Sequence, residues 1–350
     1  MQATPTVAAW RAAGSTREIR PMAQQQTIRD AARNLAAADL FRKISTEERA
    51  AKVAEEVRNM PDAALQAMSR ISGIPAHHTD LHVAMMRGQE NEFSLGLNAL
   101  DGWFQPGDLI LMTGNLALAH AQKALYKDAR SSHVAIVHAD FICIDAIPKV
   151  GASNRVIPDV LADVEPGWRA IRHKSVGPEN TDDIMRACAY YLAQPYKILP
   201  SKKSAKKFAY CSELARKVYR DIGVAGTGIP DDRIIAPAHF DRLADQHPSW
   251  ADVTDSLRPA VEFCQKYPEI LRSTAKVFID GLKLNRRRFE ERTESLARIQ
   301  VLAKAGKISK EDAHGAVAQI REIERNMNHT FWDVPRNIGK FKRPGEDKAA

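Results

Sequence analysis

The chain has 350 residues, enough to bury a full hydrophobic core, and its 44% hydrophobic and 27% charged residues are typical of a globular protein. No apolar run approaches the roughly 18 residues of a membrane-spanning helix, and the N-terminal stretch lacks the apolar core of a signal peptide. The net charge is +8, but the basic residues are dispersed and aromatics make up only 7%, so we expect no nucleic-acid partner.

The first ninety residues have helical spacing after a flexible start. The pattern predicts helices over 27–42, from a Ser45–Glu48 capping box to Pro61, and from an Asp62 cap to Gly73. Residues 75–80 are expected to form a linker.

From about Phe93 the pattern becomes typical of strands. Apolar runs predict strands at 108–112, 133–137, 141–144 and 168–172. The second and third are expected to form a hairpin through His138, Ala139 and Asp140, with His138 facing solvent and Cys143 facing the core. Helices are predicted over 181–192, with Thr181 as the N-cap, and from Cys211 onward. This combination predicts an α+β domain with an antiparallel sheet.

The C-terminal part returns to helical spacing. Phe289, Leu296, Ile299 and Ala303 share one face of a helix that Gly306 ends, and Ser309 with Asp312 begins another. We therefore predict an antiparallel helical hairpin. The expected division is a helical region over 1–90, an α+β domain over 91–255, the hairpin region over 256–335 and a flexible basic tail over 336–350.

Cys211 stands where an extended segment gives way to a helix. A thiol attacks as the thiolate, and the free N–H groups and dipole of a helix N-terminus favour that negative charge. A nucleophilic thiol also needs an imidazole, and none lies nearby in the sequence. The alternative is a buried structural cysteine at the start of a helix.

His133 opens a predicted strand directly after a polar stretch, so its side chain can point over the sheet edge. Asp145 follows the apolar run of the next strand, near the end that pairs with His133, and a carboxylate there needs a partner. The spacing permits a triad of Cys211, His133 and Asp145. It equally permits a hydrogen-bonded strand-end histidine and a carboxylate in a turn.

The order of several motifs resembles a known family. The motifs are PGDLIL (106–111), SHVAIV (132–137), ICIDA (142–146), QPY (194–196) and YCSEL (210–214). In this order they are similar to circularly permuted NlpC-type papain-like cysteine hydrolases of the YiiX/YaeF-like branch. Residues 234–253 also resemble that branch, except that Ala236 stands where a hydroxyl residue is usual.

The resemblance implies a permuted papain-like catalytic domain over 91–255. It implies Cys211 as nucleophile, His133 as base and Asp145 as the third member, with the Cys211 backbone N–H in an oxyanion hole. Beside these we expect Tyr210, Ser132, Tyr196, Lys206 and Lys207 to bind substrate, the two lysines as part of a basic run suited to an anionic group. No cofactor is expected.

The resemblance leaves the substrate open between amides of peptidoglycan stem peptides and acyl lipids, which would make the protein an amidase or peptidase, or an acyl-lipid hydrolase or acyltransferase. A catalytically inactive binding module is a further alternative. Without a signal peptide we expect a cytoplasmic protein at synthesis. Export as an antibacterial effector by a specialised secretion system would explain the helical flanks as contacts for a secretion partner or an inhibitory immunity protein.

Metal binding is not expected. The four cysteines are widely spaced without a CxxC pair, which is unlike a zinc site or a disulfide framework. His77, His78 and His82 form a local cluster, but no carboxylate pattern of metalloprotease type accompanies them.

Overall fold

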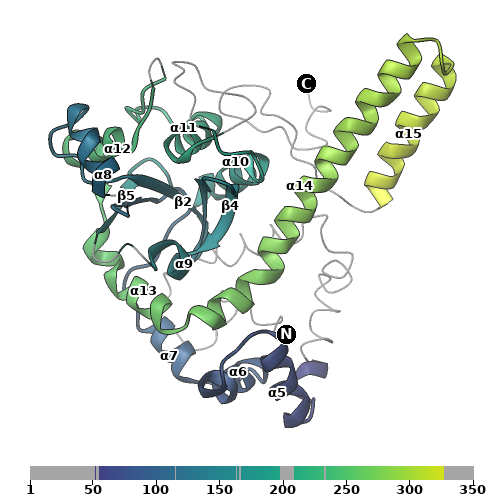
Figure 1. Cartoon of the computed structure of the whole chain (residues 1–350). Coiled ribbons are helices and arrows are strands. Elements are labelled where there is room, and N and C mark those ends of the chain that lie inside the picture. The colour runs from purple at the N-terminus through teal and green to yellow at the C-terminus, as the bar shows by residue number, and fades with distance from the viewer. Residues whose placement is uncertain are drawn as a thin grey trace.

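The fold is built on one antiparallel sheet covered by helices (Figure 1). The structure, a computed structural model, describes residues 52–326 except 53–54, 115, 163, 165–166, 198–208 and 232–233. The helix expected over 27–42, the Ser45–Glu48 capping box and the tail over 336–350 lie outside these residues. The α+β class and the antiparallel sheet are confirmed.

The sheet has six strands in the order β4-β3-β2-β1-β5-β6, and every neighbouring pair is antiparallel. The strands are β1 (Leu109–Met112), β2 (His133–Ala139), β3 (Ile142–Ile147), β4 (Gly151–Val156), β5 (Trp168–His173) and β6 (Trp250–Asp252). The apolar runs located β1, β2, β3 and β5, whereas β4 and β6 were not predicted.

Helices precede, connect and follow the strands. They are α5 (Asp62–Ile71), α6 (Thr79–Met86), α7 (Glu92–Asn98), α8 (Leu116–Ala121), α9 (Ile157–Leu161), α10 (Thr181–Tyr191), α11 (Cys211–Asp221), α12 (Pro237–Gln246), α13 (Thr254–Lys266), α14 (Pro268–Lys304) and α15 (Lys310–Asn326). Short 3₁₀ turns are η1 (Ala76–His78), η2 (Gln122–Ala124) and η3 (Pro178–Asn180).

The core lies between the sheet and the helices that pack on it. Helices α10 and α11 pack against β2 and against each other above the sheet in Figure 1, while α9 and α13 lie below it. Helix α11 also contacts β3, and α14 contacts the edge strand β4. Ile270 and Leu271, at the start of α14, belong to the same core as the strands.

The N-terminal part differs from the prediction in three places. Asp62 is the first residue of α5 rather than its cap, which is Pro61, although the helix does end just before Gly73. The linker expected over 75–80 is wrong, because η1 and the start of α6 occupy it. The segment around Phe93 is helix α7, capped by reciprocal hydrogen bonds between Asn91 and Ser94, rather than the start of the strands.

The β2–β3 hairpin is tighter than predicted. Strand β2 continues to Ala139, and the turn falls at Asp140 and Phe141, where Asp140 adopts a φ of 43°. His138 is therefore buried within the strand instead of facing solvent, and its Nε2 lies 2.9 Å from Asn154 Oδ1. Burial lowers the pKa of His138 to about 4. Cys143 is buried in β3, as expected.

The predicted start of α10 and the predicted C-terminal hairpin can also be compared with the structure. Thr181 is the first residue of α10 and not its N-cap, which is Asn180. The C-terminal hairpin is confirmed: α15 folds back along α14 in Figure 1, Gly306 takes a φ of 66° at the turn, and the Asp312 N–H donates to Ser309 Oγ at 3.0 Å.

Candidate active site

Cys211 is the first residue of α11, and the extended backbone of Tyr210 forms the N-cap. The helix is strongly amphipathic, with Leu214 and Val218 fully buried, which holds it against β2 and β3. Its N-terminus therefore points at the beginning of β2. The Cys211 side chain is buried there, with the residue 7% exposed.

His133 opens β2 and lies against Cys211. On the pleated sheet Ala135 is paired with Asp145, so His133 is the diagonal neighbour of Asp145 on the same face. The imidazole bridges that diagonal, with Nε2 2.9 Å from Asp145 Oδ2. Since Nε2 is engaged by the carboxylate, Nδ1 is the ring nitrogen left to face the thiol. The structure thus brings together the three residues that the sequence nominated.

The electrostatics of Cys211 and His133 favour an ion pair. Burial raises the pKa of the Cys211 thiol, but the charge and hydrogen bond of His133, with a hydrogen bond from the Val134 backbone N–H, outweigh it, and the net pKa is lowered. Burial likewise opposes the imidazolium, yet the Cys211 thiolate and then Asp145 raise the pKa of His133 to about 10. Both shifts favour the thiolate and the imidazolium over the neutral thiol and the neutral imidazole.

A second carboxylate holds the backbone that leads into His133. Asp241, on α12, is completely buried, and its Oδ2 accepts the backbone N–H groups of Arg130 at 2.9 Å and Ser131 at 2.8 Å. Its Oδ1 accepts the Ser131 hydroxyl at 2.8 Å. Sequence reasoning missed Asp241. Its one local signal is an acidic residue on the buried face of an amphipathic helix.

The residues expected to bind substrate fall into three groups. The Ser132 hydroxyl donates to the Met112 carbonyl at 3.3 Å, so it braces β1. Burial and then the charge of Cys211 raise the pKa of Tyr196, and burial and then Glu213 raise that of Tyr210 to about 12. Both rings are thus partly buried beside the thiol. Lys206 and Lys207 lie outside the described residues.

The other cysteines lack this environment. Cys143, Cys188 and Cys264 are buried and form no disulfide, and burial raises the pKa of both Cys143 and Cys188. The charge of Arg155 opposes this rise at Cys143 but does not outweigh it. Of the thiols with a shifted pKa, Cys211 is the one whose pKa is lowered. Within the described part of the chain, no group of histidine, cysteine and carboxylate side chains is arranged to hold a metal ion.

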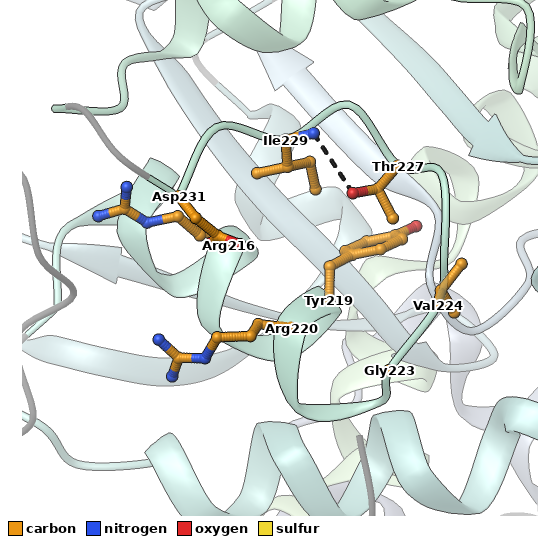
Figure 2. A pocket seen from close by; sticks show the side chains of 8 residues that line it. All are labelled: Arg216, Tyr219, Arg220, Gly223, Val224, Thr227, Ile229 and Asp231. Atoms are coloured by element: carbon orange, nitrogen blue, oxygen red, sulfur yellow. Dashed lines mark hydrogen bonds between the residues drawn. The ribbon is translucent and has the colours of Figure 1, made fainter. Parts of the chain in front are cut away.

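The C-terminal half of α11 borders a separate hollow of about 170 Å³, shown in Figure 2. Arg216, Tyr219 and Arg220 line it from the helix, and the following loop closes it, with the Ile229 N–H bonded to Thr227 Oγ1 at 3.3 Å. None of the described residues that line it is a cysteine or a histidine. The candidate nucleophile, Cys211, lies at the opposite end of α11.

Comparison with known proteins gives a weak structural similarity. No protein-family model matches the chain, and no curated protein matches it. A crystal structure described as the metalloprotein YiiX from Escherichia coli O157:H7 aligns over 44% of this chain and 98% of its own, with a TM-score of 0.35 and 19% identity. The similarity is too weak to support a functional conclusion.

Proposed function

We propose that the protein is a cysteine hydrolase that cleaves an amide or ester bond through an acyl-thioester on Cys211. The observation that carries the proposal is the buried thiol whose pKa is lowered by His133, with His133 in turn bonded to the buried Asp145. The motif order further supports a circularly permuted papain-like domain, in which the histidine strand precedes the cysteine helix.

The proposed reaction begins from the thiolate and imidazolium. Cys211 Sγ attacks the substrate carbonyl carbon, and the resulting oxyanion is stabilised by backbone N–H groups at the start of α11, where helix donors have no intrahelical partner. When the carbon–nitrogen or carbon–oxygen bond breaks, His133 gives its proton to the leaving group. Neutral His133 then takes a proton from water, the hydroxide attacks the thioester, and the acid leaves as Cys211 returns to the thiolate.

For the substrate we propose amides of peptidoglycan stem peptides, with acyl lipids as the alternative class. The support is the motif resemblance, since the basic run before Cys211 lies outside the described residues. Cleavage of peptidoglycan by this chain would require export, which fits an antibacterial effector made in the cytoplasm and carried by a specialised secretion system.

Labelling and substrate assays test the proposal together. We expect iodoacetamide to modify Cys211 faster than it modifies glutathione, and expect the excess rate to vanish in His133→Ala while Cys264→Ala behaves as wild type. Purified peptidoglycan and phospholipid vesicles are then incubated separately with wild type and Cys211→Ala. Released stem-peptide fragments or released fatty acid, present only with wild type, identify the class. Labelling no faster than glutathione would instead favour an inactive binding module.

A further inference from the structure

The carboxylate of Asp145 has two cationic donors on one oxygen. Asp145 Oδ2 lies 2.9 Å from His133 Nε2 and 3.0 Å from Arg155 Nη1. The side chain is 0% exposed, and its Oδ1 has no hydrogen-bond partner among the described residues. A buried carboxylate is stable as an anion only when charged or polar partners compensate for the lost water. Arg155 is therefore part of the environment of the triad.

Arg155 is itself held in place from the far side. It belongs to β4, where it is paired with Cys143 of β3, and its Nη2 donates to the Asp159 carbonyl in α9. The Asp159 carboxylate accepts hydrogen bonds from Arg272 of α14 at 2.8 and 2.6 Å. Nη1 is thus bonded to Asp145 and Nη2 to the Asp159 backbone, which holds the guanidinium between β3 and α9.

The proposed reaction makes the second donor necessary. His133 alternates between imidazolium and neutral imidazole, and in the neutral state it no longer compensates the charge of Asp145. An arginine keeps its charge at every pH that a protein meets, so Arg155 is a permanent cation at that oxygen. Without it, the neutral-imidazole stage would leave an isolated anion in the core.

We infer that Arg155 is a positioning residue for the His133–Asp145 pair, and that it holds the carboxylate in place while the imidazole gains and loses its proton. The inference rests on the proposed function, because it assigns Arg155 a part in that proton cycle. Arg155 does not touch substrate. Its charge also disfavours the imidazolium, so it limits how tightly the proton is held on His133.

The titratable and charged groups around Arg155 and this pair come from five elements. They are Cys211 on α11, Cys143 on β3, Arg155 on β4, Asp159 on α9, and Arg272, Lys276 and Asp280 on α14. The α14 charges are paired, Arg272 with Asp159 and Lys276 with Asp280 at 2.8 Å. They line a groove of about 270 Å³ that exposes 29% of the Arg155 side chain. Among the described residues that line this groove, Arg155 is the one bonded directly to Asp145.

The test is the pH dependence of iodoacetamide labelling of Cys211 in the full chain. The labelling rate plotted against pH changes in two places. On the acid limb the Cys211 thiolate becomes protonated, and on the basic limb the His133 imidazolium loses its proton. In Arg155→Met we expect both limbs to move to higher pH, by about one pH unit. The loss of a nearby positive charge makes the thiolate less stable, which raises the acid limb, and the imidazolium no longer faces a second cation, which raises the basic limb. In Asp145→Asn the basic limb should move to lower pH instead.

Two variants separate charge from structure. Arg155→Lys keeps the cation and is expected to keep both limbs at wild-type positions, even if its labelling is slower. Lys276→Met removes a groove charge whose ion pair is with Asp280 and not with Asp145 or Asp159, and its limbs should not move. Circular dichroism establishes that each variant is folded. If Arg155→Met does not fold, Arg155→Gln, which keeps a hydrogen-bond donor without the charge, is measured in its place.

The outcomes distinguish this inference from the proposed function. Folded Arg155→Met with both limbs at wild-type positions overturns the role of Arg155 while leaving the hydrolase intact. A shift of the same size in Arg155→Lys also overturns it. If wild-type Cys211 labels no faster than glutathione, the proposed function fails, and the titration of the His133 ring by NMR in wild type and Arg155→Met then decides whether Arg155 acts on the pair.

Discussion

The prediction worked out furthest concerns the aspartate of the PGD motif. Asp108 is fully buried directly before β1. Arg172 of β5 donates two hydrogen bonds to its carboxylate, from Nε to Oδ1 at 2.7 Å and from Nη2 to Oδ2 at 2.7 Å. The Gln105 backbone N–H adds a third bond at 2.8 Å. We predict that Arg172→Met strongly destabilises the fold without touching the proposed site.

The size of the effect follows from what the substitution leaves behind. Breaking a buried ion pair by removing one partner costs about 3–5 kcal/mol, because the remaining charge is uncompensated. Burial raises the pKa of Asp108, and the hydrogen bond and charge of Arg172 oppose that rise. A carboxyl group whose pKa is raised by folding makes the folded state less stable as pH increases through that pKa. The loss in the free energy of unfolding of Arg172→Met, relative to wild type, should therefore become smaller as pH falls.

Urea unfolding followed by circular dichroism at pH 5 and pH 7.5 measures both features. Lys276→Met is the control, since it removes an exposed ion pair with Asp280 and should cost less than about 1 kcal/mol. The double variant Asp108→Asn/Arg172→Met should recover part of the lost free energy of unfolding, because it removes the uncompensated charge of Asp108. A loss below about 1 kcal/mol in Arg172→Met, or a deficit that is the same at both pH values, would refute the reasoning.

Three other substitutions test single contacts. Asp241→Ala frees the Ser131 amide and hydroxyl that align His133, and we expect slower iodoacetamide labelling of Cys211 at pH 7.5, by up to about 100-fold. Gly151→Ala should lower the free energy of unfolding by more than about 1 kcal/mol, because φ is +84° and a Cβ would lie 2.3 Å from the Gln194 carbonyl oxygen. Burial lowers the pKa of Lys217 to about 8, so its ammonium penalises the folded state, and stability from this residue is lost as pH falls from about 10.5 to 8. Lys217→Met should remove that dependence in urea unfolding.

Asp241→Ala and Gly151→Ala each have a matched control. Asp245→Ala, one turn along α12, breaks bonds to Tyr126 and Arg169 instead and should leave labelling unchanged. Gly114→Ala meets no atom within 4 Å and should be close to neutral. Equal effects of a substitution and its control would contradict the contact it tests. For Lys217→Met, an unchanged pH dependence between 8 and 10 would contradict the assignment.

The central strands could be predicted because each is a short apolar run buried on both faces. Strand β4 could not, since GASNRV contains small and polar residues whose partners are distant. Asn154 meets His138, and Arg155 meets Asp145, across strands that only the folded sheet brings together. The same long-range pairing explains why His138 was expected in solvent. The domain boundaries, such as 91–255, stay predictions.

The candidate site was predictable in its chemistry and not in its supports. Cys211 and His133 carry local signals, a helix start and a strand start, and motif order linked them. Asp241 carries only the signal of an acidic residue on a buried helix face, and the Val134 N–H carries none, because their roles depend on which backbone groups α12 and α11 meet. A sequence shows which residues can react, whereas the groups that aim and ionise them are set by tertiary contacts.

The bond between α12 and the loop before β2 has a consequence for how the protein is made. Asp241 lies 110 residues after Ser131 and follows Cys211 in the chain, so a ribosome releases all three proposed catalytic residues before their anchor. Contacts of such large sequence separation form late in folding. We expect thiol reactivity at Cys211 to arise only after α12 has docked, so a nascent chain of this protein would carry an unactivated thiol from the synthesis of Cys211 until α12 (Pro237–Gln246) is in place.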